Sequence, residues 1–438
     1  MKTSPVCIFW FRRDLRLNDN AGLYYALRQE HAVQPVFIFD TEILEELEDK
    51  RDKRVTFIFH AIEALQKQLI EKGASLDVRK GKPITVFKQL LKEYEVKSVY
   101  FNHDYEPYAR ARDKEIYTFL TQNKIEVRHF KDQVIFEKKE ILKGDGTPYH
   151  VFTPYANKWK AQVNEFYLKS YPVKNYFRNF HQRKAIPFPS LEEIGFEKAA
   201  VKFPSGSFDE DTIRNYHKMR DIPSAEGTTR LGVHLRFGTV SIRELARLAK
   251  DLNPVFLKEL IWREFFQTIL WHYPDVVTES FKKQYDRIKW RNNEKEFVAW
   301  FEGRTGYPIV DAGMRELNET GYMHNRVRMI VASFLCKHLL IDWRWGEAYF
   351  AKKLLDYELA SNNGNWQWAA GSGCDAAPYF RIFNPTLQTR KFDPQQKYIK
   401  KWVPEYGTDN YPPPLVEHEA ARKRCLEAYG KAVRANDI

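Results

Sequence analysis

The chain has 438 residues, which is too long for one ordinary domain, so we expect about two or three domains. Apolar residues make up 43% and charged residues 29%, a composition that excludes disordered and collagen-like chains. The longest apolar runs fall far short of the roughly 20 residues of a membrane span, and no cleavable leader pattern precedes the first one. We therefore expect a cytoplasmic protein with no membrane partner.

The charge and the aromatic content point to a planar or polyanionic partner. The net charge is +12, and aromatic residues are 15% of the chain. Basic charge with many flat rings suits a protein that neutralises phosphates and stacks on bases or on another planar ring, although an aromatic-rich helical core gives the same composition. The four cysteines lie far apart with no Cys-x-x-Cys pair, so we predict neither a metal site nor disulfides.

Five short runs rich in β-branched and aromatic residues lie in the first third of the chain and predict strands. They are residues 6–11, 36–40, 76–79, 98–102 and 125–130. Segments with helical periodicity lie between them, including 54–72 and 83–94. The alternation predicts a doubly wound, parallel, five-stranded sheet that binds any ligand at the carboxyl ends of its strands.

The rest of the chain reads as a connector followed by helices. Residues 137–154 predict a hairpin that turns at Gly144-Asp145-Gly146, and the proline-rich stretch 171–208 predicts a long surface linker. From about Phe208 the periodicity is helical, which predicts an all-α half. Its expected helices are 241–252, 257–273, 309–320, 325–340 and 345–355, with one more in the tail from 412 to 438. These patterns place an α/β domain at 1–131, a connector at 132–207 and a helical domain at 208–438.

Three motifs of the helical half combine polar and planar side chains. The run 228–232 (TTRLG) enters a predicted helix and can either hold a phosphate or simply cap the helix. Glu259, Trp262 and Arg263 share one helical face and can either bind and stack on a base or form core and an ion pair. The run 362–368 (NNGNWQW) is rare in a plain core, because buried amides need partners, and it favours a ligand contact.

A further pattern involves one arginine and two carboxylates. Arg328 has candidate partners in Asp356 and Glu358, and a buried Arg–carboxylate pair beside a planar redox ring would help to hold negative charge on that ring. Asn325 and Met329 share a helical face through their i, i+4 spacing.

Together these sequence motifs resemble those of the photolyase/cryptochrome flavoproteins, and the resemblance extends over nearly the whole chain. The resemblance rests on residues 9–19 (FWFRRDLRLND), 321–326 (GYMHNR), 341–343 (IDW), 362–368 (NNGNWQW) and 375–385 (DAAPYFRIFNP), which occur in the order and spacing of the family. It implies an N-terminal α/β domain that can hold a light-harvesting antenna and a C-terminal helical domain that binds FAD.

The resemblance also implies which residues contact the flavin. They are Tyr216, Thr228, Thr229, Arg230, Leu231, Gly232, Arg328, Asp356, Tyr357, Glu358 and Asn362, with Asn362 beside flavin N5. Trp366, Trp343 and Trp290 match the electron-transfer chain that leads from the flavin towards the surface. The active cofactor of this family is the reduced, anionic form of FAD.

Within the family, the cavity residues are similar to the branch that repairs cyclobutane pyrimidine dimers, the class I DNA photolyases. The positions that contact the dimer in that branch correspond to Glu259, Trp262, Arg263, Asn325, Arg326, Met329 and Trp368, and those that hold phosphates to Arg220, Arg326 and Arg381. The implied reaction is light-driven electron transfer from excited reduced FAD to a dimer flipped out of UV-damaged DNA. We expect a monomeric enzyme.

The antenna site departs from one branch of the family. Folate-binding relatives carry Asn-Glu where this chain has Tyr108-Ala109, and its Glu-Pro-Tyr at 106–108 looks closer to deazaflavin-binding relatives. Deazaflavin and methenyltetrahydrofolate both stay open as the second chromophore. A blue-light photoreceptor cryptochrome and a photolyase for another lesion are the alternative functions.

Overall fold

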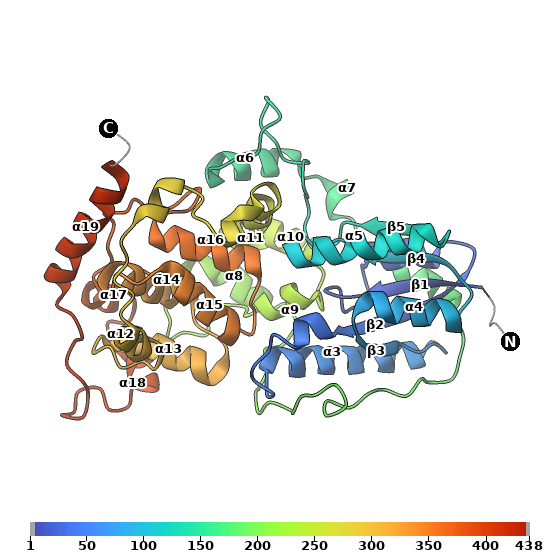
Figure 1. The fold of residues 1–438 in the computed structure, drawn as a ribbon, viewed down its shortest axis with the longest axis horizontal. Coiled ribbons are helices and arrows are strands. Elements are labelled where there is room, and N and C mark those ends of the chain that lie inside the picture. Colours follow the sequence, from blue (N-terminus) through green and yellow to red (C-terminus); the bar gives the residue numbers. More distant parts are fainter. Residues whose placement is uncertain (1–4, 435–438) are drawn as a thin grey trace. The chain divides into compact units, whose positions relative to one another are not determined.

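A computed structural model of the protein describes residues 5–434, which form two compact units (Figure 1). The first unit comprises the described residues up to Glu137 together with Gln162–Phe208 and Arg230–Leu248. The second comprises Lys138–Ala161, Asp209–Thr229 and the described residues from Ala249 onward. The domain limits at 131 and 208 stay predictions, and the expectations for residues 1–4 and 435–438 lie outside the described residues.

The first unit is built on the predicted parallel sheet, whose five strands have the order β3-β2-β1-β4-β5. The strands are β1 (Val6–Phe11), β2 (Ala32–Asp40), β3 (Asp77–Gly81), β4 (Val96–Asn102) and β5 (Glu126–Phe130). All five strand predictions are confirmed, and the doubly wound topology with them. β2 begins four residues earlier than predicted, because Gln34 and Pro35 interrupt the apolar pattern without ending the strand.

Helices cover both faces of this sheet. Successive side chains of β1 point to opposite faces, and all of them are buried. Ile8 and Trp10 belong to a buried cluster with Phe87 of α4 (Pro83–Glu93) and with residues of α5 (Pro107–Gln122). Phe9 points to the opposite face. There α1 (Ala21–Leu27) lies so close that a Cβ on Gly22 would be 3.0 Å from the Phe9 ring.

The remaining elements of the first unit include short pieces of the connector. They are α2 (Thr41–Leu44), α3 (Lys53–Ile70), α7 (Glu165–Leu168), the 3₁₀ helix η1 (Val173–Asn179) and α9 (Gly232–Phe237), and α10 (Ile242–Leu252) begins in this unit. The linker after η1 follows the sheet for part of its length, since the His181 N–H donates to the Val33 carbonyl oxygen at 2.8 Å.

The second unit is helical, as predicted, and its core is a buried aliphatic and aromatic cluster. Its elements are α6 (Phe152–Gln162), α8 (Glu210–Met219), α11 (Pro254–His272), η2 (Pro274–Val277), η3 (Lys283–Arg287), α12 (Glu294–Phe301), α13 (Pro308–Thr320), α14 (Asn325–Ser333), the π-helical turn η4 (Phe334–His338), α15 (Trp343–Lys353), α16 (Leu359–Ala370), α17 (Pro385–Phe392), α18 (Lys397–Trp402) and α19 (His418–Arg434). In residues 5–434 no helix combines the length and hydrophobicity needed to cross a bilayer.

Two local predictions need correction. Residues 137–154 form no strand pair; only the turn is present, with the Lys143 N–H donating to the Thr147 carbonyl oxygen at 2.9 Å. The Gly-Asp-Gly signal specifies a turn, but the charged residues before it lack the alternation that a strand needs. The helix predicted over 325–340 is α14 followed by η4, so its regular part ends at Ser333.

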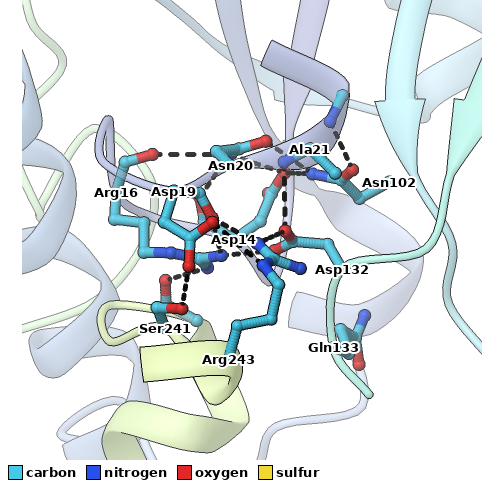
Figure 2. Close-up of polar contacts among 12 residues, drawn as sticks. Asp14, Arg16, Asp19, Asn20, Ala21, Asn102, Asp132, Gln133, Ser241 and Arg243 are labelled. Carbon is cyan, nitrogen blue, oxygen red and sulfur yellow. Dashed lines mark hydrogen bonds and ion pairs between the residues drawn. The ribbon is translucent and has the colours of Figure 1, made fainter. Parts of the chain in front are cut away.

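A buried ion-pair network fixes the carboxyl edge of the sheet in the first unit (Figure 2). Arg243 donates to Asp19 Oδ1 at 2.9 Å and to Asp132 Oδ1 at 2.8 Å, and Arg16 donates to Asp132 Oδ2 at 2.8 Å. Burial alone would raise the pKa of Asp132, but Arg16 and Arg243 outweigh it and hold that pKa below its ordinary value. The network therefore ties the loop after β1 and the segment after β5 to α10.

We expect Arg243→Ala to destabilise the protein by about 3 kcal/mol or more, because it removes the ion pair of the buried Asp19 and leaves the buried Asp132 with Arg16 alone. The matched control is Arg51→Ala. Arg51 pairs with Glu197 at the surface, where the Arg51 side chain is 70% exposed and the Glu197 side chain is 58% exposed. That change should cost less than about 0.5 kcal/mol. Urea unfolding followed by circular dichroism measures both, and equal losses for the two variants would contradict the role of the network.

Candidate functional site

The second unit contains a cavity with about 600 Å³ of empty space, part of it open to solvent. Its walls come from α14, α15, α16 and the segment between α15 and α16. The predicted site residues that line it are Asn325, Arg328, Met329, Asp356, Tyr357, Glu358, Asn362, Trp366 and Trp368. The structure thus brings residues predicted to contact a flavin together with residues predicted to contact a dimer.

A predicted ion pair holds one wall of the cavity. The Arg328 guanidinium donates through Nη2 to both carboxylate oxygens of Asp356 at 3.1 Å, which confirms one of its two candidate partners. Burial disfavours the charge of Arg328, but Asp356 outweighs this effect and the pKa of Arg328 is raised. A fixed positive charge therefore faces the cavity.

The other candidate partner of Arg328 belongs to a second ion pair. Glu358 accepts hydrogen bonds from Arg263 Nη2 at 2.8 Å, from Gln267 Nε2 at 3.0 Å and from Ser361 Oγ at 2.9 Å. Glu358 is buried, so these donors supply the hydrogen bonds that water would otherwise provide. Arg263 is thereby connected to the cavity wall.

Asn362 is held by a residue that the sequence did not single out. Its Nδ2 donates to the Glu347 carboxylate at 2.8 Å and to the Glu347 carbonyl oxygen at 3.1 Å. Burial raises the pKa of Glu347, and the hydrogen bond from Asn362 opposes that rise. These two bonds use both N–H donors of the Asn362 amide and fix which end of it is nitrogen, which leaves its carbonyl oxygen for other contacts.

The three predicted relay tryptophans lie in or beside the core of the second unit. Trp366 and Trp343 are almost fully buried, and Trp290 is half-buried and packs edge-on against Tyr429 with ring centroids 5.8 Å apart. Helix α15, which begins at Trp343, passes directly over the Trp366 ring: a Cβ on Gly346 would lie 2.1 Å from Cη2 of that ring.

The residues predicted to contact DNA are already paired with carboxylates in this structure. Arg220 donates to Glu259 at 2.5 Å, and Arg326 donates to Asp221 at 2.7 Å. Arg381 is exposed. Two of the three predicted phosphate ligands thus have a countercharge that a phosphate would replace.

The predicted phosphate run 228–232 spans the boundary between the two units. Thr228 and Thr229 belong to the second unit, where Thr228 Oγ1 lies 3.1 Å from the Tyr322 hydroxyl. Arg230 and the residues after it belong to the first unit, and the run enters α9 at Gly232, as the sequence predicts. Arg230 has a left-handed backbone conformation with φ 52°, which turns the chain into the helix.

The strand ends predicted to bind an antenna carry a hydrogen-bonded tyrosine. Tyr108 donates to Asp40 Oδ2 at 2.6 Å and lies 3.1 Å from Glu42 Oε2. Burial and the hydrogen bond to Asp40 raise the pKa of Tyr108, so it stays a neutral donor. The identity of an antenna at this edge stays a prediction.

Several residues of the site escaped the sequence analysis. They include Glu347, Gln267, Ser361 and Phe152, whose ring stacks on Trp262. Ser361 directly precedes the predicted run 362–368, and this position is the signal that could have found it. Glu347 and Phe152 lie on other elements, so no local pattern connects them to their partners.

Comparisons with known proteins agree with this arrangement. One family model, the FAD binding domain of DNA photolyase, matches residues 256–408, and another, DNA photolyase, matches residues 7–174. A deoxyribodipyrimidine photo-lyase of Escherichia coli strain K12 is 38% identical, covering 97% of this chain and 98% of its own. The chain is therefore a flavoprotein with an FAD-binding domain, and it belongs to the DNA photolyase family.

Solved structures show the same relationship. A bacterial class III photolyase from Agrobacterium tumefaciens has a TM-score of 0.87 at 33% identity, covering 99% of this chain and 98% of its own. An archaeal photolyase from Sulfolobus tokodaii, solved with two FAD molecules, has a TM-score of 0.82 at 36% identity, covering 97% of this chain and 100% of its own. The predicted fold and family are confirmed.

We expect Gly346→Ala to destabilise the protein by about 1–3 kcal/mol, because the new Cβ displaces the Trp366 ring from a packed core. The matched control is Gly430→Ala in α19, where no heavy atom outside its own helix lies within 4 Å of the new Cβ. That change should stabilise by about 0.5–1 kcal/mol through helix propensity. Thermal unfolding of both variants measures the difference, and two shifts of the same sign would contradict the close approach at Gly346.

Proposed function

We propose that the protein repairs cyclobutane pyrimidine dimers in UV-damaged DNA with energy from light. The observation that supports this proposal is the single cavity lined both by Arg328, Asp356 and Asn362 and by Met329 and Trp368. The first three match the flavin-contacting positions of the family, and the last two match positions that face the dimer. A cavity with both sets can hold a cofactor and a lesion within reach of each other.

The chemistry of the cavity fits FAD. Its lining joins a buried guanidinium and a primary amide to apolar side chains such as Ala332 and Leu354, which suits a flat ring with a polar edge. When bound, reduced FAD supplies the electron that splits the dimer after light absorption. Arg328 provides positive charge for an anionic ring, Asp356 keeps that guanidinium in place, and Asn362 offers its amide to the ring edge.

The remaining flavin contacts follow from family membership. Tyr216 and the run 228–232 are proposed to hold the rest of the cofactor, with Tyr357 and Glu358 in the cavity wall. Hydroxyl and backbone N–H groups suit phosphate oxygens. The Glu358 carboxylate acts indirectly, because its hydrogen bonds from Arg263 and Gln267 fix the start of α16, which carries Asn362.

DNA recognition is assigned to flat rings and to guanidinium groups. Trp262 and Trp368 are proposed to stack on the flipped-out dimer, each contributing about 1–3 kcal/mol. Glu259 and Asn325 are proposed to hydrogen-bond the pyrimidine edges. Arg220, Arg326 and Arg381 are proposed to hold phosphates, which position the strand without reading its sequence.

Three further assignments complete the proposal. Trp366, Trp343 and Trp290 are proposed to carry electrons to oxidised flavin from the surface, so that light restores the reduced cofactor. A deazaflavin or methenyltetrahydrofolate antenna is proposed at the strand ends near Tyr108. The protein is proposed to act as a monomer on cytoplasmic DNA.

Repair is tested directly on an oligothymidylate that has been irradiated with ultraviolet light. The reduced holoprotein should restore the ultraviolet absorbance of the thymine bases under blue light and leave it unchanged in the dark. Recovery that does not depend on light would contradict photorepair. No recovery by a flavin-loaded, DNA-binding protein would move the function to another lesion or to photoreception.

Trp343→Phe should stop the photoreduction of oxidised flavin, because phenylalanine is much harder to oxidise than an indole. Repair should return once the flavin is reduced chemically, since that treatment bypasses the relay. Trp402→Phe on α18 is the control and should photoreduce at the normal rate. Flavin absorbance under blue light follows both variants, and unchanged photoreduction in Trp343→Phe would exclude this route.

A further inference from the structure

Trp262 is stacked on a residue from a distant part of the chain. The ring of Phe152, the first residue of α6, lies parallel to the Trp262 ring of α11, with centroids 3.6 Å apart and an interplanar angle of 4°. Phe152 is only 2% exposed, whereas Trp262 is half-buried. Because Phe152 covers one face of the indole, the accessible surface of Trp262 is left to its other face and its edges.

Phe152 is itself held in place from several directions. Its backbone N–H donates to Asp375 Oδ2 at 3.0 Å, its ring meets Phe265 edge-on at 5.8 Å, and Lys258 Nζ lies 5.6 Å from its ring centroid. Asp375 is the first residue of segment 375–381, whose last residue is Arg381. These contacts and its burial hold Phe152 in place without involving Trp262.

The other rings around Trp262 do not set its plane in this way. Phe265 and Phe266 are the third and fourth residues after Trp262 on the same helix, and their rings meet the indole at 79° and 30°. The χ2 torsion of a tryptophan is broad, so an indole that lacks a flat neighbour samples several planes. Ordering a mobile side chain on binding costs affinity.

We propose that Phe152 is a positioning residue that holds the Trp262 indole in the plane in which it stacks on a flipped-out pyrimidine. This inference rests on the proposed function, because it assigns Trp262 to the damaged base. Phe152 does not touch the DNA; it removes the cost of ordering Trp262 at the moment of binding. Through Asp375 it also ties the position of the indole to the segment that carries Arg381.

The test is a double-mutant cycle of Phe152→Leu and Trp262→Ala in the holoprotein. Affinity is measured in the dark for dimer-containing DNA and for undamaged DNA of the same sequence. Trp262→Ala should weaken binding to the dimer by about 5- to 150-fold, as loss of one stacked base implies. Phe152→Leu should weaken it by about 2- to 10-fold, since leucine fills the space but offers no flat face.

The decisive comparison is the effect of Phe152→Leu in the Trp262→Ala background. If Phe152 acts through Trp262, affinity there should change by less than about 2-fold, and binding to undamaged DNA should not change in any variant. Phe87→Leu, which alters a buried aromatic residue of the first unit, controls for general loss of packing and should leave both affinities unchanged. Phe152→Met replaces the leucine variant if that variant does not fold.

Four results would overturn the inference. Three of them concern Phe152: unchanged dimer affinity in the Phe152 variant that folds, an equal loss in the Trp262→Ala background, and an equal loss for undamaged DNA. Unchanged affinity in Trp262→Ala would overturn it as well, because no stacking would then need positioning. Failure of the proposed function would give a different result: the unaltered protein would neither bind dimer-containing DNA more tightly than undamaged DNA nor repair it.

Discussion

The two ion pairs made by the short segment between α15 and α16 determine the shape of the second unit's cavity. Asp356 binds Arg328 of α14, and Glu358 binds Arg263 of α11. The two carboxylates are two residues apart in the chain, and each of them anchors a different helix to this segment. Because Glu358 is buried and a buried charge that loses its partner costs several kcal/mol, its ion pair holds α11 firmly at the cavity wall, and the half-buried pair of Arg328 with Asp356 adds a smaller contribution from α14. The hollow therefore persists beside a close-packed core, where apolar side chains alone would fill such a space.

The cavity and the aromatic core of the second unit share the side chain of Trp366. Trp366 lines the cavity and also packs against Phe350 and Trp300 in the main buried cluster of the unit. Gly346 lets α15 approach the indole so closely that Trp366 has no room for another orientation. An electron relay depends on fixed distances between rings, and close packing supplies that rigidity without any dedicated support. The positions of Trp366 and Trp343 in the proposed relay therefore depend on the packing of the core as much as on the proposed cofactor site.

Local periodicity was sufficient to predict several of the longer helices, such as α3, α11 and α13, and short β-branched and aromatic runs predicted the buried strands. Periodicity did not predict other helices, including α6 and α16. It failed where the backbone departs from regularity, as at η4, where the π-helical turn leaves the apolar pattern of the sequence unchanged. In the site, residue types indicated Asp356 and Glu358 as candidate partners of Arg328 but could not decide between them, and the structure shows Asp356. The partners Glu347 of Asn362 and Phe152 of Trp262 were not predictable, because long-range packing joins residues whose spacing follows no local period.

The ion pairs of Arg220 and Arg326 in the free protein affect how the proposed activity would distinguish damaged DNA from intact DNA. Arg220 and Arg326 are paired with Glu259 and Asp221, so a phosphate at either proposed contact would compete with a carboxylate for the guanidinium. Each such exchange replaces one favourable ion pair by another, and its net gain is smaller than that of a free arginine. Electrostatic contacts that any DNA can make are thereby weakened. Stacking on tryptophan rings, available only to a base that has left the duplex, would then supply most of the preference for a lesion.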